Sequence, residues 1–305
     1  SSDVCSSDLI GLGAVGCSYA HLVKKAGLEL KIVAGGERAG RISSGMLING
    51  ETILFDTVAP GETYGADLLL VACKFHNLNQ VIADMAGCVG KGTVIVSLLN
   101  GLGAEELLQA AYPKNTVLYC RVAGLAVLKN GGELSIGGYG CWKAGAADNT
   151  VISPAVAALA AFCERIGLPL IVPADMLHAV WWKLMCNVGI NQCSAVLRAP
   201  YGVFQKIPEA RSMMLSAMEE VRAVAPSAGV TLTDEDVAEW LGLLDSLVDW
   251  GKTSMLQDVE AKRKTEVEIL AGSVIKAGEK LGVPTPVNRF LFNQLRAIEK
   301  MNGIG

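Results

Sequence analysis

Three polar side chains, Lys183, Asn187 and Asn191, recur at every fourth residue of the otherwise apolar segment 181–191. Four residues of an α-helix turn about 400°, so these side chains shift by only about 40° per step and line one face. The ammonium group can stabilise a negative charge and give up a proton, and each amide both donates and accepts hydrogen bonds. Burying such groups is costly unless a polar partner lies opposite. That partner is either a small polar ligand or neighbouring backbone, and the segment alone leaves both open.

A glycine-rich turn near the start of the chain opens a predicted amphipathic helix. The spacing Gly11-x-Gly13-x-x-Gly16 is typical of dinucleotide binding: a tight turn, room for a pyrophosphate at the helix N-terminus, and close packing of helix on strand. A predicted strand at 28–34 completes the βαβ context. We therefore predict a Rossmann-type turn that binds the cofactor through Gly11, Leu12, Gly13, Ala14, Val15 and Gly16.

The residues after that second strand decide which dinucleotide is bound. An acid there binds the ribose diol, whereas an arginine accommodates a 2′-phosphate. The sequence Gly35-Gly36-Glu37-Arg38 contains both. Because two glycines leave the strand end without an acid, we favour Arg38 and a 2′-phosphate. The alternative is that Glu37 and Arg38 form a solvated turn.

Two further apolar runs, 67–74 and 93–98, are typical of buried parallel strands. Lys74 ends the first run, and Asn100 follows the second in a glycine-rich loop before a predicted helix. Ligands of doubly wound sheets lie beyond the carboxyl ends of the strands. We therefore expect Lys74 and Asn100 on the ligand side, although Asn100 could also be an ordinary turn amide.

From Ser153 onward the pattern changes to helices. With Pro173 as the boundary, we predict a doubly wound α/β domain at 1–172 and an all-helical domain at 173–305. Ser254-Met255-Leu256-Gln257 fits a capping box, so Ser254 could simply be an N-cap. Glu266 is expected on a later turn of the same helical region.

The composition narrows the class of partner. The 305 residues are 51% hydrophobic and 18% charged with a net charge of -4, which fits a packed globular protein with a small-molecule ligand and argues against nucleic acid or an anionic membrane surface. No apolar run approaches the roughly 18 residues of a membrane span, and we expect a cytoplasmic protein. Nine cysteines without a Cys-x-x-Cys pair indicate reduced thiols, and three scattered histidines indicate no metal site. A homodimer is left open.

Taken in order, these motifs resemble those of the ketopantoate reductase (2-dehydropantoate 2-reductase) family across nearly the whole chain. The motifs are Gly11 to Gly16, the strand ending in Lys74, Asn100-Gly101-Leu102-Gly103, Lys183-x-x-x-Asn187-x-x-x-Asn191, Ser254-Met255-Leu256-Gln257-Asp258, and Thr265-Glu266. The resemblance implies a Rossmann domain joined to a helical domain like that of 6-phosphogluconate dehydrogenase, with NADPH and 2-dehydropantoate meeting in the cleft. It further implies Lys183 as catalytic acid, Glu266 completing the site, Asn187, Asn191 and Ser254 holding substrate, and Asn100 touching both ligands.

The chain departs from the family pattern at three places. The first nine residues repeat Ser-Ser-Asp where the family has an apolar strand, and a cloning or translation scar is one explanation. Gly35 stands where many members carry the 2′-phosphate arginine, so Arg38 must reach from three residues further on. Lys264 stands where some members have a proline.

The implied reaction is reduction of the 2-oxo group of 2-dehydropantoate to (R)-pantoate, with Lys183 stabilising the charge on oxygen and donating the proton. One alternative is a related NADP-dependent reductase of another small 2-oxo acid. The other is a protein that binds NADPH as a sensor and catalyses no reaction. Loss of Lys183 or Glu266 would have favoured this second alternative. Both residues are present.

Overall fold

The structure, a computed structural model, describes residues 6–304 apart from the side chain of Asn130. Its first unit contains an eight-stranded sheet in the order β12-β11-β8-β7-β6-β1-β2-β5. Every neighbouring pair in it is parallel except β8 and β11. The strands are β1 Ser7–Ile10, β2 Leu30–Val33, β5 Asp56–Val58, β6 Ala66–Val71, β7 Val89–Ser97, β8 Thr116–Ala123, β11 Cys141–Gly145 and β12 Leu170–Ile171.

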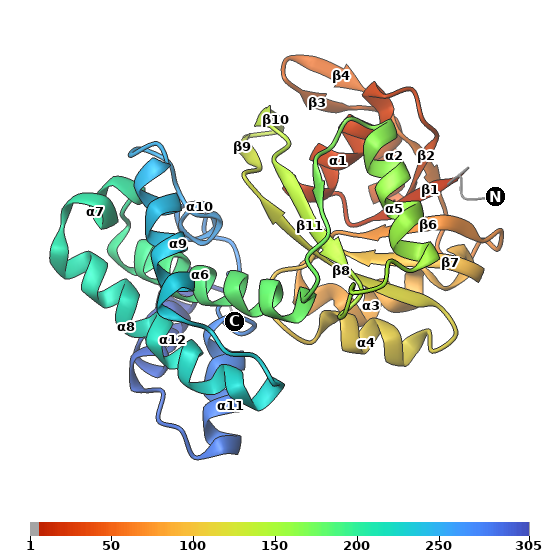
Figure 1. The fold of residues 1–305 in the computed structure, drawn as a ribbon. Helices are drawn as coiled ribbons and strands as arrows, with labels where there is room; N and C mark the ends of the chain where they lie inside the picture. The colour runs from red at the N-terminus through yellow and green to blue at the C-terminus, as the bar shows by residue number, and fades with distance from the viewer. Residues whose placement is uncertain (1–5, 305) are drawn as a thin grey trace. The chain divides into compact units, whose positions relative to one another are not determined.

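Helices cover both faces of this sheet, as Figure 1 shows. One apolar cluster joins one face to α1 (Ala14–Lys25) and α5 (Pro154–Arg165), and a second joins the other face to α3 (Leu78–Asp84) and α4 (Ala104–Ala111). The helix α2 (Gly36–Ser43) follows β2. This doubly wound arrangement confirms the predicted α/β class, because buried central strands need an apolar partner on each side.

A second, four-stranded sheet was not predicted. It has the order β4-β3-β10-β9, with β3 Met46–Ile48, β4 Glu51–Ile53, β9 Ala126–Asn130 and β10 Glu133–Gly138. The Asn49-Gly50 turn that joins β3 to β4 has positive φ at both residues, 49° and 81°. An Asn-Gly pair is typical of such tight hairpin turns, so this dipeptide is the sequence feature that indicates the hairpin. The glycine-rich segment 137–145 has the composition of a loop, but it contains the end of β10 and all of β11.

The serine- and aspartate-rich start of the chain forms a central strand, although its polar residues are unlike those of a core strand. β1 pairs with β2 on one side and β6 on the other, and all four of its residues are buried. The Ser7 hydroxyl donates to the Glu29 carbonyl at 2.8 Å, and the Asp8 carboxylate accepts from the Tyr64 hydroxyl. Strand pairing therefore outweighs the poor strand propensity of these residues, although burial raises the pKa of Asp8. Residues 1–5 lie outside the described part.

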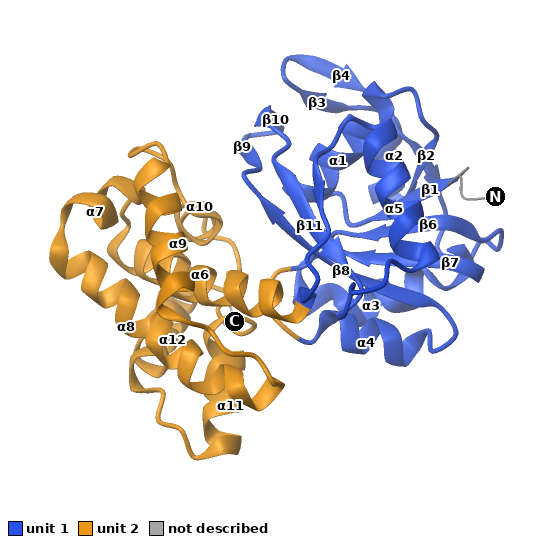
Figure 2. Ribbon diagram, in the orientation of Figure 1, with its two compact units in different colours: residues 1–99, 103–176 blue, residues 100–102, 177–305 orange. Residues whose placement is uncertain are grey.

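The second unit is helical, and Figure 2 colours the two units separately. Residues 1–99 and 103–176 form unit 1, and residues 100–102 and 177–305 form unit 2. Its helices are α6 Met176–Leu197, α7 Tyr201–Lys206, α8 Pro208–Val224, α9 Asp234–Ser246, α10 Ser254–Glu260, α11 Ala271–Leu281 and α12 Pro286–Met301. Gly189 of α6 lets α8 approach closely, since a Cβ there would lie 2.6 Å from Cγ of Met218. Within residues 6–304 no helix has the length and apolar character that a membrane crossing requires.

Two local predictions in unit 2 were wrong. The N-cap of α10 is Thr253, whose hydroxyl accepts from the Leu256 N–H at 3.1 Å, so Ser254 is the first helical residue and not the cap. Glu266 does not continue that helix, because α10 ends at Glu260 and Glu266 lies in a turn before α11. At the start of α9, Thr233 forms a full capping box with Asp236.

Candidate active site

The glycine turn between β1 and α1 has the geometry that a bound pyrophosphate needs. Gly11 has φ of 100°, and a Cβ there would lie 2.6 Å from the Ala72 carbonyl carbon. A Cβ at Gly16 would lie 2.1 Å from the Gly11 carbonyl oxygen, so helix and turn touch through backbone. A Cβ built on Gly13, in contrast, meets no other described atom within 4 Å. Two glycines are therefore required by packing, and the middle one leaves room at the helix N-terminus for a phosphate group.

Two cations lie at the same edge of the unit 1 sheet. Arg38 is exposed in the first turn of α2, directly after β2. Within residues 6–304 neither Arg38 nor its neighbour Glu37 forms an ion pair, so the guanidinium group can bind an anion. Lys74 follows β6 and precedes a 3₁₀ turn at Phe75–Asn77, and it is half-buried. Both residues follow the carboxyl ends of parallel strands, where doubly wound sheets bind their ligands.

In unit 2 the polar face of α6 is largely buried. Asn187 and Asn191 are 8% and 7% exposed, and Lys183 on the same face is half-buried. Among the described residues the Asn191 side chain makes no hydrogen bond, and Asn187 makes one, to a side chain rather than to backbone. Nearly buried amides are normally satisfied. Neighbouring backbone does not satisfy these two, which leaves the ligand interpretation with the stronger support.

Asn100 joins this face to Glu266. Its Nδ2 donates to Oε2 of Glu266 at 3.1 Å, and its Oδ1 lies 3.5 Å from Nδ2 of Asn187. Residues far apart in sequence, in the loop after β7, in α6 and in the turn before α11, therefore meet within unit 2. Spacing within a helix predicted the shared face of Asn187 and Asn191. No spacing rule relates Asn100 to Glu266, which lie 166 residues apart.

Ser254 is the site residue for which the structure gives least support. It is exposed at the first position of α10. The neighbouring Thr253 is buried and donates to the Ser194 hydroxyl of α6 at 3.2 Å, which fixes the start of α10 to α6. No sequence motif indicates this role, because Thr253 lies one residue before the Ser254-Met255-Leu256-Gln257 motif.

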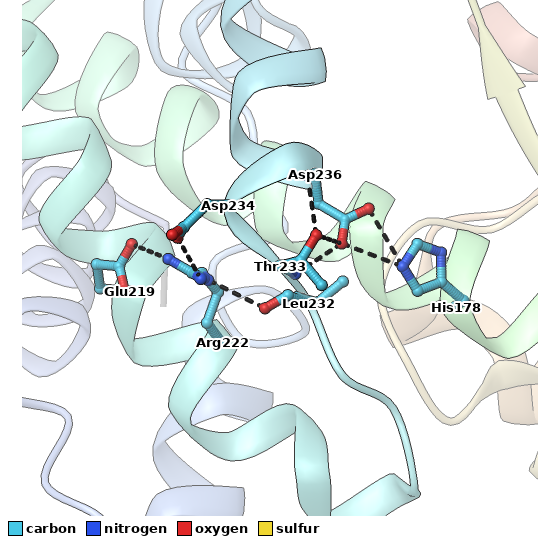
Figure 3. A network of polar contacts seen from close by, with 7 residues as sticks. All are labelled: His178, Glu219, Arg222, Leu232, Thr233, Asp234 and Asp236. Atoms are coloured by element: carbon cyan, nitrogen blue, oxygen red, sulfur yellow. Dashed lines mark hydrogen bonds and ion pairs between the residues drawn. The ribbon is translucent and has the colours of Figure 1, made fainter.

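The amino-terminal part of α6 is held by the start of α9, as Figure 3 shows. The His178 ring nitrogen lies 3.2 Å from the Asp236 carboxylate, and the Trp182 indole donates to the Asp236 carbonyl at 3.0 Å. Burial acts to raise the pKa of Asp236, but hydrogen bonds from Thr233 and His178 outweigh it and hold that pKa below its ordinary value. The contacts fix the helix that carries Lys183.

Comparisons with known proteins agree with the motifs. The description "Ketopantoate reductase PanE/ApbA" matches residues 9–149, and "Ketopantoate reductase PanE/ApbA C terminal" matches residues 175–299. The 2-dehydropantoate 2-reductase of Pyrobaculum aerophilum is 31% identical over 297 residues, which cover 97% of this chain and 99% of that protein.

Solved structures extend the comparison to the fold. A PanE/ApbA family ketopantoate reductase from Ralstonia eutropha superposes with a TM-score of 0.82 at 26% identity, covering 98% of this chain and 99% of that one. A D-mandelate dehydrogenase solved with NADH and anilino(oxo)acetate has a TM-score of 0.88 at 22% identity, covering 98% and 100%, and shares the fold. On the strength of the two family matches and the full-length relative, the chain belongs to the ketopantoate reductase family, and the resemblance of its motifs is confirmed.

Proposed function

We propose that this protein reduces 2-dehydropantoate to (R)-pantoate with NADPH, a step of pantothenate and coenzyme A biosynthesis. Family membership supports the reaction class. The observation that carries the proposal is the pair of nearly buried amides, Asn187 and Asn191, whose acceptor oxygens have no partner within residues 6–304. They share a helix face with Lys183. The substrate carries carboxylate, ketone and hydroxyl groups, which need donors as well as acceptors.

The residues of unit 1 fit the cofactor. The open space at Gly13 suits a pyrophosphate, with Leu12, Ala14 and Val15 supplying backbone beside it. Arg38 supports a 2′-phosphate and therefore NADPH, since its guanidinium has no acid partner among the described residues. The bound dinucleotide supplies the hydride.

Lys183 has the role of acid. As the ketone carbon gains hydride, negative charge develops on its oxygen, and the Lys183 ammonium stabilises that charge and then gives its proton to form the hydroxyl. Glu266 is acceptor-only when ionised, so it orients donors: the Asn100 amide at 3.1 Å, and by proposal the substrate hydroxyl. Asn187, Asn191 and Ser254 are proposed to hold the substrate.

The decisive test is oxidation of NADPH and of NADH by the purified protein with 2-dehydropantoate. Replacing Lys183 by Ala is expected to lower turnover by about 100- to 10,000-fold, because proton donation and charge stabilisation are both lost. Lys300, exposed on α12, gives a matched control whose alanine variant keeps wild-type turnover. Normal turnover of the Lys183→Ala variant would remove lysine from the mechanism.

A second candidate is reduction of another 2-oxo acid. The likeness to a D-mandelate dehydrogenase favours keeping it, although at 22% identity that likeness concerns the fold alone. A panel of 2-oxo acids, including a phenyl-substituted one, separates the two candidates by kcat/KM. Tight NADPH binding without turnover of any of them would instead support a sensing protein.

Two properties of the protein remain predictions. The cytoplasm is the proposed compartment, supported by eight free cysteines in the described chain. A homodimer is tested by light scattering of the purified protein.

A further inference from the structure

One tripeptide of the chain belongs to a different unit from the residues on either side of it. Residues 100–102 cluster with unit 2, whereas the preceding strand β7 and the following helix α4 belong to unit 1. Figure 2 shows this short segment in the colour of unit 2. The loop after β7 is therefore built into the helical unit, and the question is which contacts hold it there.

An apolar contact holds the middle residue of the tripeptide. Gly101 is buried with φ of 80°, and a Cβ built on it would lie 2.3 Å from Cγ1 and 3.1 Å from the carbonyl oxygen of Ile269. Ile269 is itself only 5% exposed. No side chain fits between them, so the backbone of the loop rests directly on Ile269.

The same turn supplies the polar contact. The N–H groups of Ile269 and Leu270 donate to the Glu266 carbonyl at 3.1 and 3.0 Å, which fixes Ile269 relative to Glu266. The Thr265 N–H and hydroxyl both donate to the buried Glu299 carboxylate of α12, at 2.8 and 2.6 Å. Asn100 is thus held at two points of one anchored turn, through its own amide and through the adjoining glycine.

This arrangement fixes which end of the Asn100 amide is available. An ionised carboxylate only accepts, so Nδ2 must face Glu266, and Oδ1 is directed to Asn187. The second N–H of Nδ2 remains to donate. An amide in this orientation selects an oxygen acceptor, such as a ketone or carboxylate oxygen.

We propose that Gly101 and Ile269 are positioning residues whose contact sets the Asn100 amide as an N–H donor for an oxygen of the 2-oxo acid. This inference rests on the proposed reductase function. Asn100 then acts with the substrate-holding helix α6, although it follows a strand of the cofactor unit. A displacement of about 1 Å at such a donor can cost on the order of 100-fold in rate.

The experiment compares glycine variants that share backbone strain but differ in contact. Gly101→Ala is expected to lower kcat/KM for the 2-oxo acid by about 10- to 100-fold, with the Kd for NADPH changed by less than about threefold. Gly103→Ala is the matched control, because Gly103 also has positive φ, 91°, but faces open space. It measures strain alone. An equal loss in both variants, or a loss confined to the Kd for NADPH, overturns the proposal.

A second substitution keeps the test valid if Gly101→Ala alone folds poorly. Ile269→Ala removes Cγ1 and is expected to restore at least half of the lost stability and kcat/KM in the double variant. Ile269→Val keeps a carbon at that place and is expected not to restore them. Equal rescue by Val and Ala contradicts the contact geometry.

A readout without turnover separates this proposal from the reductase proposal. The side-chain ¹⁵N–H₂ resonances of Asn100, assigned with Asn100→Asp, are expected to shift in Gly101→Ala and to return toward wild type in the double variant with Ile269→Ala. That pattern in a protein inactive on every 2-oxo acid would refute the function and keep the positioning role. Unshifted resonances would refute the positioning role whatever the activity.

Discussion

Replacing Gly13 by Ala separates cofactor binding from folding. Gly13 has φ of -83° and ψ of -164°, which any residue adopts, and a Cβ there meets nothing within 4 Å. The folded protein therefore loses nothing, and the less flexible unfolded chain favours folding by about 0.4–1 kcal/mol. With the cofactor bound, the added methyl group would occupy the space proposed for the pyrophosphate. Overpacking of that kind costs about 1–3 kcal/mol, which corresponds to roughly a 5- to 150-fold increase in Kd for NADPH.

The assay pairs thermal unfolding with a fluorescence titration of NADPH. Gly16→Ala provides the opposite case, because its Cβ would lie 2.1 Å from the Gly11 oxygen, and it is expected to lower Tm clearly. Gly92→Ala, on β7 and also facing open space, controls for the general effect of adding a methyl group. An unchanged Kd for NADPH in Gly13→Ala, with Tm preserved, would refute the placement of the phosphates at this turn.

Three further predictions concern single contacts. Asn100 donates a hydrogen bond to Glu266, so the effects of Asn100→Ala and Glu266→Ala on kcat/KM should be coupled. A double-mutant cycle is expected to give a coupling of about 1.5 kcal/mol, or roughly tenfold in kcat/KM. Additive losses in the double variant would contradict this prediction. Arg38→Ala is expected to weaken NADPH binding by about 10- to 100-fold and leave NADH binding unchanged, whereas Arg41→Ala on the same helix changes neither. Burial raises the pKa of Asp8, so the folded state keeps the Asp8 proton to higher pH than the unfolded state does. The stability of the fold therefore falls as pH rises through that pKa. Asp8→Asn should raise Tm at pH 7 and leave it unaltered near pH 3.

Two central strands of the main sheet, β6 and β7, were predictable because their buried parts are apolar on both faces. The run 67–74 contains all of β6 except its first residue, Ala66, and the run 93–98 contains the buried part of β7. The strands β3 and β4 have three residues each and are partly exposed, so their burial pattern carries little information. β1 was missed for the opposite reason: its polar side chains are buried, and only the pairing of β2 and β6 on either side explains that.

In the candidate site, too, relations within one helix could be predicted from the sequence, whereas contacts between distant segments could not. Helical periodicity placed Lys183, Asn187 and Asn191 on one face, because that relation depends on the helix alone. The contact of Asn100 with Glu266 requires the fold of unit 2, and no sequence pattern predicted it. The family resemblance implied only that both residues belong to one site. The N-cap of α10 was misplaced by one residue, since Thr253 and Ser254 are both good caps and the contact to Ser194 decides between them.

The two glycine-rich loops show why residue type alone does not reveal what a glycine does. Gly13 and Gly101 stand in motifs of similar appearance, each after a parallel strand and before a helix. The space that a Cβ would take is open at Gly13 and already filled by Ile269 at Gly101. We propose that the missing side chain at Gly13 leaves space for a ligand, whereas at Gly101 it allows close packing against Ile269. Substitution at Gly13 should therefore change ligand affinity and spare stability, whereas substitution at Gly101 should disturb Asn100 before any ligand is present.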